Sequence, residues 1–296
     1  MNKKKIGLIG VGLMGYPMGL NWLNKDFYLS VLPNKNLDKI RQLSAKGAHV
    51  SKNMEELVAD SDVIILMLPT SKEVEAVTNE LLSFVKPKHL VIDMTTSEPQ
   101  STVKIYEKFK SQGLRFFDSP VTGGVKGATE GALTLFVGGP KEYFEETKEV
   151  LCAVSKLQKH FGAIGNGHVA KVINNYICIG NLAVFSEALP LAVKLGLNAS
   201  DIFETTQSGT GASKMLDLYG EQILNADFAP RFKMEHALKD LKIADSIAKG
   251  LGITLPVLEG MLKDFDAAQK QGYLSENISA LIRPIENKLG AFFRKK

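Results

Sequence analysis

Lys171 and Asn175, four residues apart in this chain of 296 residues, form the pair whose types and spacing best suit proton transfer. Residues at positions i and i+4 share one face of a helix. That face is otherwise apolar, where a lysine is unusual because charged side chains are seldom buried. Burial lowers the pKa of a lysine and prepares it to act as a general acid or base. Taken alone, the spacing favours a simpler interpretation, a lysine that extends to solvent beside an asparagine that holds a backbone group.

A glycine-rich run near the start of the chain supplies the group with which such a lysine would work. The run Gly10-Val11-Gly12-Leu13-Met14-Gly15 directly follows an apolar stretch and precedes a helical pattern. In this order the glycines permit a tight turn, a close approach of N–H groups to a pyrophosphate, and close packing of helix on strand. The helix N-terminus favours the anion. We therefore predict a nicotinamide dinucleotide site, beside which a lysine would protonate the carbonyl that receives hydride.

Two further clusters are candidates for a role in the chemistry. Thr122-Gly123-Gly124 follows a predicted strand, and its N–H groups and hydroxyl would cradle a carboxylate. An ordinary turn has the same composition. Phe232 and the pair Lys239-Asp240 lie on or beside a predicted helix that starts near residue 234. A Lys–Asp pair on a helix is usually solvated, so this pair gains a role only if its helix faces the cleft.

The elements that must position these residues alternate in the first half of the chain. Apolar runs predict strands at residues 5–9, 28–32, 63–67, 90–93, 116–118 and 133–137, with helical patterns between most of them. This alternation predicts an α/β fold, a Rossmann-type doubly wound parallel sheet. Residues 168–195 predict one long helix that ends at Gly196 and is kinked or broken at Pro190. We predict a dinucleotide-binding domain over residues 1–164 and an all-α substrate and oligomerisation domain over 165–296.

Composition narrows the classes of function. The 36 lysines and arginines against 32 acidic residues give a net charge of +4, with the basic residues scattered, which argues against nucleic acid as a partner. No apolar run looks long enough to span a bilayer, and the start of the chain lacks a secretion-signal pattern. The two cysteines form no CxxC pair, and the five histidines lack metal-ligand spacing. We therefore expect a cytoplasmic protein without a metal or a membrane.

Four motifs in order resemble the β-hydroxyacid dehydrogenase family, which includes 3-hydroxyisobutyrate dehydrogenases, tartronate semialdehyde reductases and glyoxylate or succinic semialdehyde reductases. They lie at residues 7–18, 118–139, 165–175 and 232–241. The resemblance implies reversible reduction of a short carboxylate-bearing aldehyde to its hydroxy acid with NAD(P)H. It implies that Lys171 is the general acid and base, that Asn175 stands beside it, and that Thr122-Gly123-Gly124 holds the substrate carboxylate.

The resemblance also implies which residues contact the cofactor and how the chain assembles. It implies that Leu68, Pro69 and Thr96 line the nicotinamide and its ribose, that Lys239 lies near the cofactor, and that Phe232 and Asp240 belong to the substrate site. It further implies a homodimer or homotetramer built through the long helix. After the second predicted strand, the run Leu32-Pro33-Asn34-Lys35-Asn36 has no acidic residue for a ribose hydroxyl, whereas Lys35 suits a 2′-phosphate. This favours NADP(H), held with the help of Asn34 and Lys35.

Two alternatives remain open on the sequence. An imine reductase shares this fold, but such relatives usually carry Asp or Tyr in place of Lys171 and lack the carboxylate cradle. A non-catalytic, dinucleotide-binding scaffold would have lost the catalytic lysine, whereas Lys171, Asn175 and Lys239 are all present here.

Overall fold

The computed structural model describes residues 3–33 and 36–295. The chain divides into two compact units, of which the first ends at Lys171 and the second begins at Val172. The division therefore falls inside a long helix, which begins at Asn166 in the structure and at residue 168 in the prediction.

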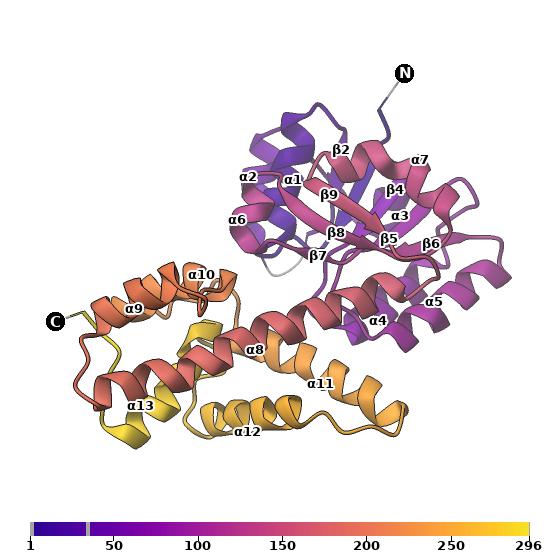
Figure 1. Ribbon diagram of the computed structural model, residues 1–296. Coiled ribbons are helices and arrows are strands. Elements are labelled where there is room, and N and C mark those ends of the chain that lie inside the picture. Colours follow the sequence, from indigo (N-terminus) through magenta and orange to yellow (C-terminus); the bar gives the residue numbers. More distant parts are fainter. Residues whose placement is uncertain (1–2, 34–35, 296) are drawn as a thin grey trace. The chain divides into compact units, whose positions relative to one another are not determined.

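The first unit is built on a six-stranded parallel sheet in the order β3-β2-β1-β4-β5-β6 (Figure 1). Its strands are β1 (Ile6–Ile9), β2 (Leu29–Val31), β3 (His49–Val50), β4 (Val63–Leu66), β5 (Leu90–Asp93) and β6 (Arg115–Asp118). This order, with the first strand in the middle, is that of a dinucleotide-binding doubly wound sheet. The predicted fold class is confirmed, although the two-residue strand β3 was not predicted.

Alternation along the strands explains why helices cover both faces of this sheet. In β4, Val63 and Ile65 point into one apolar core, whereas Ile64 and Leu66 point into another. The first core is covered by α1 (Gly15–Asn24) and α2 (Leu37–Ala45). The second is covered by α3 (Met54–Ala59), α4 (Ser71–Leu81) and α5 (Pro99–Ser111). Both faces being buried, the strands appear in the sequence as continuous apolar runs.

A second, three-stranded sheet follows in the order β7-β8-β9. It contains β7 (Val121–Thr122), β8 (Leu133–Val137) and β9 (Ser155–His160), with α6 (Gly124–Thr129) and α7 (Lys141–Cys152) between them. The sequence predicts β8 as a further strand of the parallel sheet, and this is wrong. β8 pairs antiparallel with β7 and parallel with β9, and a single bridge from Asp118 to Gly138 joins it to β6.

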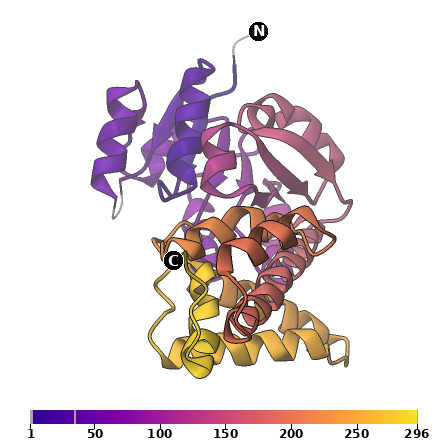
Figure 2. The ribbon, with the colours of Figure 1, turned by 60° about the vertical axis from the view of Figure 1, so that its left-hand side comes forward.

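The regular secondary structure of the second unit is helical over the described residues, as predicted, apart from one isolated bridge. After α8 (Asn166–Lys194) come α9 (Ala199–Ser208), α10 (Lys214–Leu224), α11 (Met234–Gly250), α12 (Pro256–Lys270), the 3₁₀ helix η1 (Ile278–Ile282) and α13 (Arg283–Leu289). In Figures 1 and 2, α8 lies between the α9–α10 pair and α12. Its inner side, including Ile179, Leu182 and Phe185, belongs to the core of this unit.

The long helix α8 runs through Pro190 without a break. It ends as predicted, because Gly196 has a left-handed φ of +94° and the N–H groups of Gly196 and Leu197 bond back to Val193 and Ala192. Among the described residues, α8 is long and apolar enough to cross a membrane by length and composition alone, with 39% of the critical stretch buried. This finding corrects the expectation that no stretch is long enough. Core helices of soluble proteins meet the same criterion.

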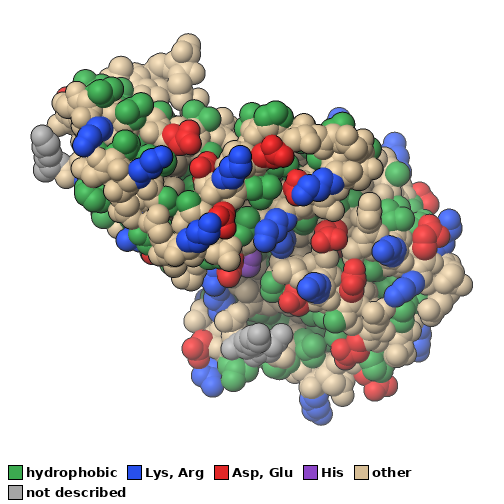
Figure 3. Space-filling model, turned by 90° about the horizontal axis from the view of Figure 1, so that it is seen from below, with side chains coloured by type: hydrophobic (Ala, Val, Ile, Leu, Met, Phe, Trp, Pro, Cys, Tyr) green, Lys and Arg blue, Asp and Glu red, His purple; other side chains and the backbone are tan. Residues whose placement is uncertain are grey.

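Charges of both signs are interspersed over the face of the molecule in Figure 3. This mixture agrees with the small net charge of +4. Side chains of one sign do not gather into a broad patch on that face.

Candidate functional site

The glycine-rich loop between β1 and α1 has the backbone that its three glycines predict. Gly10 has a φ of +109°, and a Cβ there would lie 2.1 Å from the carbonyl oxygen of Met67. A Cβ on Gly15 would lie 2.0 Å from the carbonyl oxygen of Gly10, so both glycines are required for packing. A Cβ on Gly12 would meet nothing within 4 Å. Gly12 therefore borders open space, into which a pyrophosphate can approach the backbone at the start of α1.

Lys39, in the first half of α2, lies beside this loop and was not predicted. Its Nζ donates to the carbonyl oxygen of Gly12 at 3.1 Å, and partial burial lowers its pKa. Asn36 donates to the neighbouring carbonyl of Val11 at 3.3 Å. A lysine held at this loop adds positive charge where the phosphates of a dinucleotide would lie. The signal in the sequence was a basic residue in the helix that follows the second strand. Asn34 and Lys35, predicted to hold the 2′-phosphate of NADP(H), lie outside the described residues.

The carboxyl ends of β4, β5 and β6 are adjacent, because Leu66 pairs with Asp93 and Asp93 pairs with Asp118. The loops that follow these strands carry Leu68, Pro69 and Thr96, which the sequence predicts beside the nicotinamide. The N–H of Leu68 donates to Thr95 Oγ1 at 3.0 Å, so the loops after β4 and β5 are joined directly. Such an edge is where doubly wound sheets bind ligands.

The segment predicted for the substrate carboxylate turns sharply. Thr122 closes β7, Gly123 has a φ of +126° and Gly124 has a φ of +63°. Both values lie in the left-handed region that favours glycine. A Cβ on Gly124 would meet nothing within 4 Å, so this backbone also borders open space.

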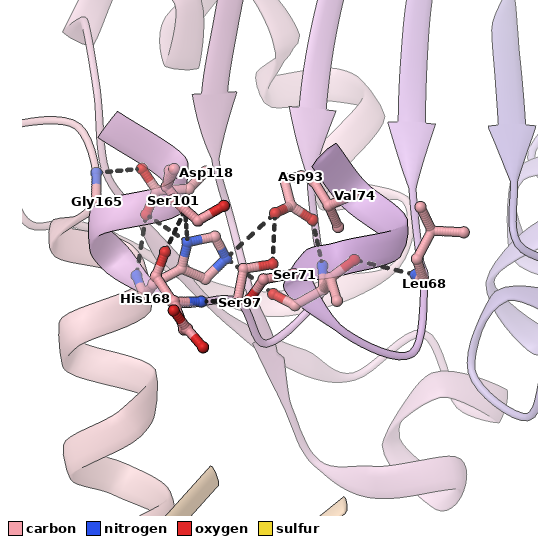
Figure 4. Close-up of polar contacts among 12 residues, drawn as sticks. Leu68, Ser71, Val74, Asp93, Ser97, Ser101, Asp118, Gly165 and His168 are labelled. Atoms are coloured by element: carbon pink, nitrogen blue, oxygen red, sulfur yellow. Dashed lines mark hydrogen bonds and ion pairs between the residues drawn. The ribbon is translucent and has the colours of Figure 1, made fainter. Parts of the chain in front are cut away.

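The start of α8 is fixed tightly beneath its predicted catalytic residues. Asp118 accepts hydrogen bonds from the N–H groups of Gly165 at 2.7 Å and His168 at 2.9 Å, and so caps the helix (Figure 4). Burial raises the pKa of Asp118, against the charge of His168 and these two N–H groups, which lower it. Lys171 follows one turn later and is only 7% exposed. Asn175 lies one turn further along the same face and is 4% exposed.

The structure brings three predicted residues of the second unit together. The side-chain amide of Asn175 donates to Asp240 Oδ2 at 2.5 Å, and Lys239 Nζ lies 3.1 Å from Asp240 Oδ1. Asp240 is 3% exposed, so this is not the solvated pair that the sequence alone favours. Phe232 packs against the helical core, and its N–H donates to Asn277 Oδ1 at 3.0 Å.

The other predicted residues belong to the first unit. The glycine loop, Leu68, Pro69, Thr96 and the segment from Thr122 to Gly124 all precede Lys171. Sequence reasoning missed two kinds of contributor, namely Lys39 and the buried partners of His168. Lys39 lies in a helix whose sequence has no special pattern, and the partners of His168 are carboxylates far away in the sequence.

One group among the described residues has the composition of a metal site, although the sequence predicts no metal. Ligand atoms of His49, Glu56 and Asp60 lie within 4.8 Å of one another. Glu56 already accepts hydrogen bonds from His49 Nε2 at 3.2 Å and from the N–H of Lys52 at 2.7 Å. None of the three belongs to the predicted site, and their contacts are those of a surface ion-pair cluster.

Comparison with known proteins finds relatives over nearly the whole chain. Residues 5–174 match the NAD-binding domain of 6-phosphogluconate dehydrogenase, and residues 165–285 match the NAD-binding domain of NADP-dependent 3-hydroxyisobutyrate dehydrogenase. The chain is 34% identical to 2-(hydroxymethyl)glutarate dehydrogenase of Eubacterium barkeri, over 97% of this chain and 96% of that protein. It is 31% identical to NAD-dependent L-serine dehydrogenase of Pseudomonas aeruginosa, over 94% and 96% of the two chains.

A solved structure shows the same likeness. The structure of 3-hydroxyisobutyrate dehydrogenase from Mycobacterium tuberculosis with L-serine matches with a TM-score of 0.82 and 28% identity, over 95% of this chain and 98% of that one. These relatives are dehydrogenases of hydroxy acids, and the family models describe binding of NAD or NADP. The chain therefore belongs to the β-hydroxyacid dehydrogenase family of NAD(P)-dependent oxidoreductases.

Proposed function

We propose that this enzyme reversibly reduces a short carboxylate-bearing aldehyde to its hydroxy acid, with Lys171 as general acid and base. The observation that carries the proposal is a lysine only 7% exposed, one helical turn before an asparagine whose amide is fixed by Asp240. A lysine is rarely buried to this extent, and buried lysines are suited to proton transfer. The cofactor, when bound, supplies hydride to the carbonyl carbon. Lys171 Nζ gives its proton to the carbonyl oxygen and takes it back in the oxidation.

The remaining predicted residues orient the substrate. The backbone at Gly123 and Gly124, with the Thr122 hydroxyl, suits a carboxylate because it combines left-handed glycines with open space at Gly124. Holding that carboxylate would place the carbonyl for hydride and proton transfer at once, and such positioning accounts for a large part of catalytic rate. Asn175 keeps the face beside Lys171 polar and ordered.

We propose NADP(H) as the preferred cofactor. The run from Leu32 to Asn36 lacks an acidic residue that would bind the ribose hydroxyls and repel a 2′-phosphate. Lys35 lies in this run and carries the positive charge that suits a 2′-phosphate. Positive charge without a competing carboxylate favours the more highly charged dinucleotide.

We further propose that a second copy of the chain covers the outer face of α8. Ile173, Ile177, Val184, Leu191 and Leu195 are between 49% and 75% exposed, and their spacing of four and seven residues returns to one helix face. Exposed apolar surfaces of this kind mark interaction sites. The exposed Asn181 and Glu187 on the same helix would be costly in a bilayer. A homodimer or a dimer of dimers buries the face by pairing it with itself.

The test is oxidation of NADPH and NADH, followed at 340 nm, with glyoxylate and with succinic, methylmalonate and tartronate semialdehydes. The reverse direction is assayed with L-serine and 2-(hydroxymethyl)glutarate. Because a general acid contributes about 10²–10⁴-fold, Lys171→Ala is expected to lose at least about 100-fold in kcat while it still binds NADPH. Lys194→Ala, an exposed lysine on the same helix, is the matched control and keeps its activity.

Three results would overturn the proposal. Near-normal turnover by Lys171→Ala would remove the lysine from the chemistry. Turnover of cyclic imines with none of any semialdehyde or hydroxy acid would assign the chain to imine reduction, and tight NADPH binding without turnover of any substrate would make it a scaffold.

A further inference from the structure

A closed polar network lies under the start of α8, and the proposed chemistry does not use it. His168, Asp93 and Asp118 are all 0% exposed. His168 Nε2 lies 2.9 Å from the carbonyl oxygen of Thr95, and Nδ1 lies 2.8 Å from Thr102 Oγ1 (Figure 4). A carbonyl oxygen can only accept, so Nε2 carries a hydrogen and donates it to Thr95. Each ring nitrogen also lies 3.7 Å from one carboxylate oxygen, of Asp93 or of Asp118.

On one side the network fixes the loops that follow β4 and β5. Asp93 accepts from the N–H of Thr95 at 2.9 Å and from Ser97 Oγ at 2.8 Å. Thr95 in turn accepts from the N–H of Leu68 through its hydroxyl and from His168 through its carbonyl. Thr95 therefore joins the loop at Leu68, the end of β5 and the start of α8.

On the other side the network fixes the helix that carries Lys171. Asp118 caps its first turn. The backbone of this turn also packs closely against β8, since a Cβ on Gly167 would lie 2.3 Å from the carbonyl oxygen of Phe136. His168 itself belongs to this turn, three residues before Lys171. At about 1.5 Å of rise per residue, the two lie about 4.5 Å apart along the helix axis. A shift of the imidazole is thus a shift of Lys171.

We propose that His168 is a positioning residue, which sets the distance between the proton donor Lys171 and the nicotinamide-lining loop at Thr95 and Thr96. The inference rests on the proposed role of Lys171. Three buried ionisable groups are a costly way to hold a fold together, since apolar side chains often replace such groups without loss of stability. A fully bonded polar network does, however, hold one geometry. The hydride and the proton must reach neighbouring atoms of one carbonyl, and an error of 1 Å can cost about 100-fold in rate.

The experiment compares His168→Leu, which removes both ring contacts, with His168→Gln, whose amide can still donate to Thr95. His160→Gln is the matched control, because His160 also bonds a backbone carbonyl, that of Gly139 at 2.7 Å, but lies outside the network. For each we measure kcat, KM, the dissociation constant of NADPH, and isotope effects on kcat from D₂O and from deuterated NADPH. Active sites are counted by titration with NADPH, so that loss of folded enzyme is not mistaken for slow catalysis.

We expect His168→Leu to lose about 10- to 100-fold in kcat per active site, with the NADPH dissociation constant within about threefold of wild type. Its D₂O isotope effect rises because proton transfer becomes slower, whereas His168→Gln recovers most of kcat and His160→Gln matches wild type. If His168→Leu does not fold, Thr102→Val, which removes only the hydroxyl at Nδ1, is expected to show the same rise in the D₂O effect with a smaller loss of kcat.

The inference fails if kcat per active site and the D₂O effect stay at wild-type values in His168→Leu, or in Thr102→Val where that variant replaces it. It also fails if His168→Gln is no better than His168→Leu. Lys171→Ala is assayed alongside. If that variant is inactive and the His168 variants behave as wild type, the positioning role alone is wrong. If Lys171→Ala is active, the proposed function is wrong as well.

Discussion

Asp240 shows how one side chain can organise two predicted site residues. Its two oxygens meet Asn175 at 2.5 Å and Lys239 at 3.1 Å, and it is 3% exposed. A buried carboxylate that lost its partners would be destabilising, so these three residues depend on one another. The sequence places all three on helices but cannot show that a residue at 240 faces one at 175.

Two lysines that we propose as cofactor ligands, Lys35 and Lys39, differ in the part of the cofactor that each is expected to contact. Lys39 Nζ is held at the Gly12 oxygen, at the loop where a pyrophosphate would lie. Both dinucleotides carry a pyrophosphate, so Lys39→Ala is expected to raise KM for NADPH and NADH alike, by about 10-fold for a charge-assisted hydrogen bond. Lys35→Ala is expected to raise KM for NADPH alone, because only NADPH has a 2′-phosphate.

The measurement is initial rate against cofactor concentration, with Lys46→Ala as control, an exposed lysine at the end of α2. An equal effect of Lys35→Ala on both cofactors would contradict the proposed basis of NADP preference. A Lys39→Ala variant with unchanged KM would show that the loop does not need its charge.

At the scale of elements, the contact between the start of α8 and the second sheet depends on two glycines. A Cβ on Gly138 would lie 2.5 Å from the N of Gly167, and a Cβ on Gly167 would lie 2.5 Å from Asp118 Oδ2. The helix can therefore approach Asp118 only because both positions lack a side chain. The motif Gly165-Asn166-Gly167 is therefore a packing motif, which lets the first turn of α8 lie close to Asp118 and so fixes the turn that leads to Lys171.

Gly167→Ala is expected to destabilise the protein by about 1–3 kcal/mol, because an added methyl group in a tightly packed place forces the backbone to move. Gly260→Ala is the matched control. Gly260 also lies in a helix, α12, but a Cβ there meets nothing within 4 Å. That substitution is expected to stabilise by about 0.5–1 kcal/mol. Urea unfolding of both variants and wild type gives the two differences, and a neutral Gly167→Ala would show that the contact is looser than described.

Much of the fold, but less of the site, could be predicted from the sequence. The strands β1, β4, β5 and β6 are buried on both faces and so appear as apolar runs. Strand β9 was missed because Ser155–His160 mixes polar residues at the edge of a small sheet. The network around His168 was missed because Asp93 and Asp118 are 75 and 50 residues away in the sequence. A single histidine in an apolar helix gives no sign of such partners.

At the scale of the whole molecule, the exposed apolar face of α8 predicts that the protein is an oligomer. Ile177 is 61% exposed on α8, and Val257 is 64% exposed on α12. Ile177→Glu places a charge in the proposed interface and is expected to convert the oligomer to monomers at micromolar concentration, whereas Val257→Glu leaves it intact. Light scattering with size-exclusion chromatography measures both. A wild-type protein that is monomeric, or one that elutes only with detergent, would contradict the proposed self-association.

The length and composition of α8 also bear on how the chain is made. A ribosome completes this helix of 29 residues before it has synthesised any of the helices from α9 to α12, whose apolar residues share a core with its inner side. During that interval both sides of an apolar helix are uncovered on the nascent chain, and transiently exposed apolar surface promotes aggregation. We therefore expect the yield of folded protein to depend on chaperones while the residues after Lys194 are being synthesised.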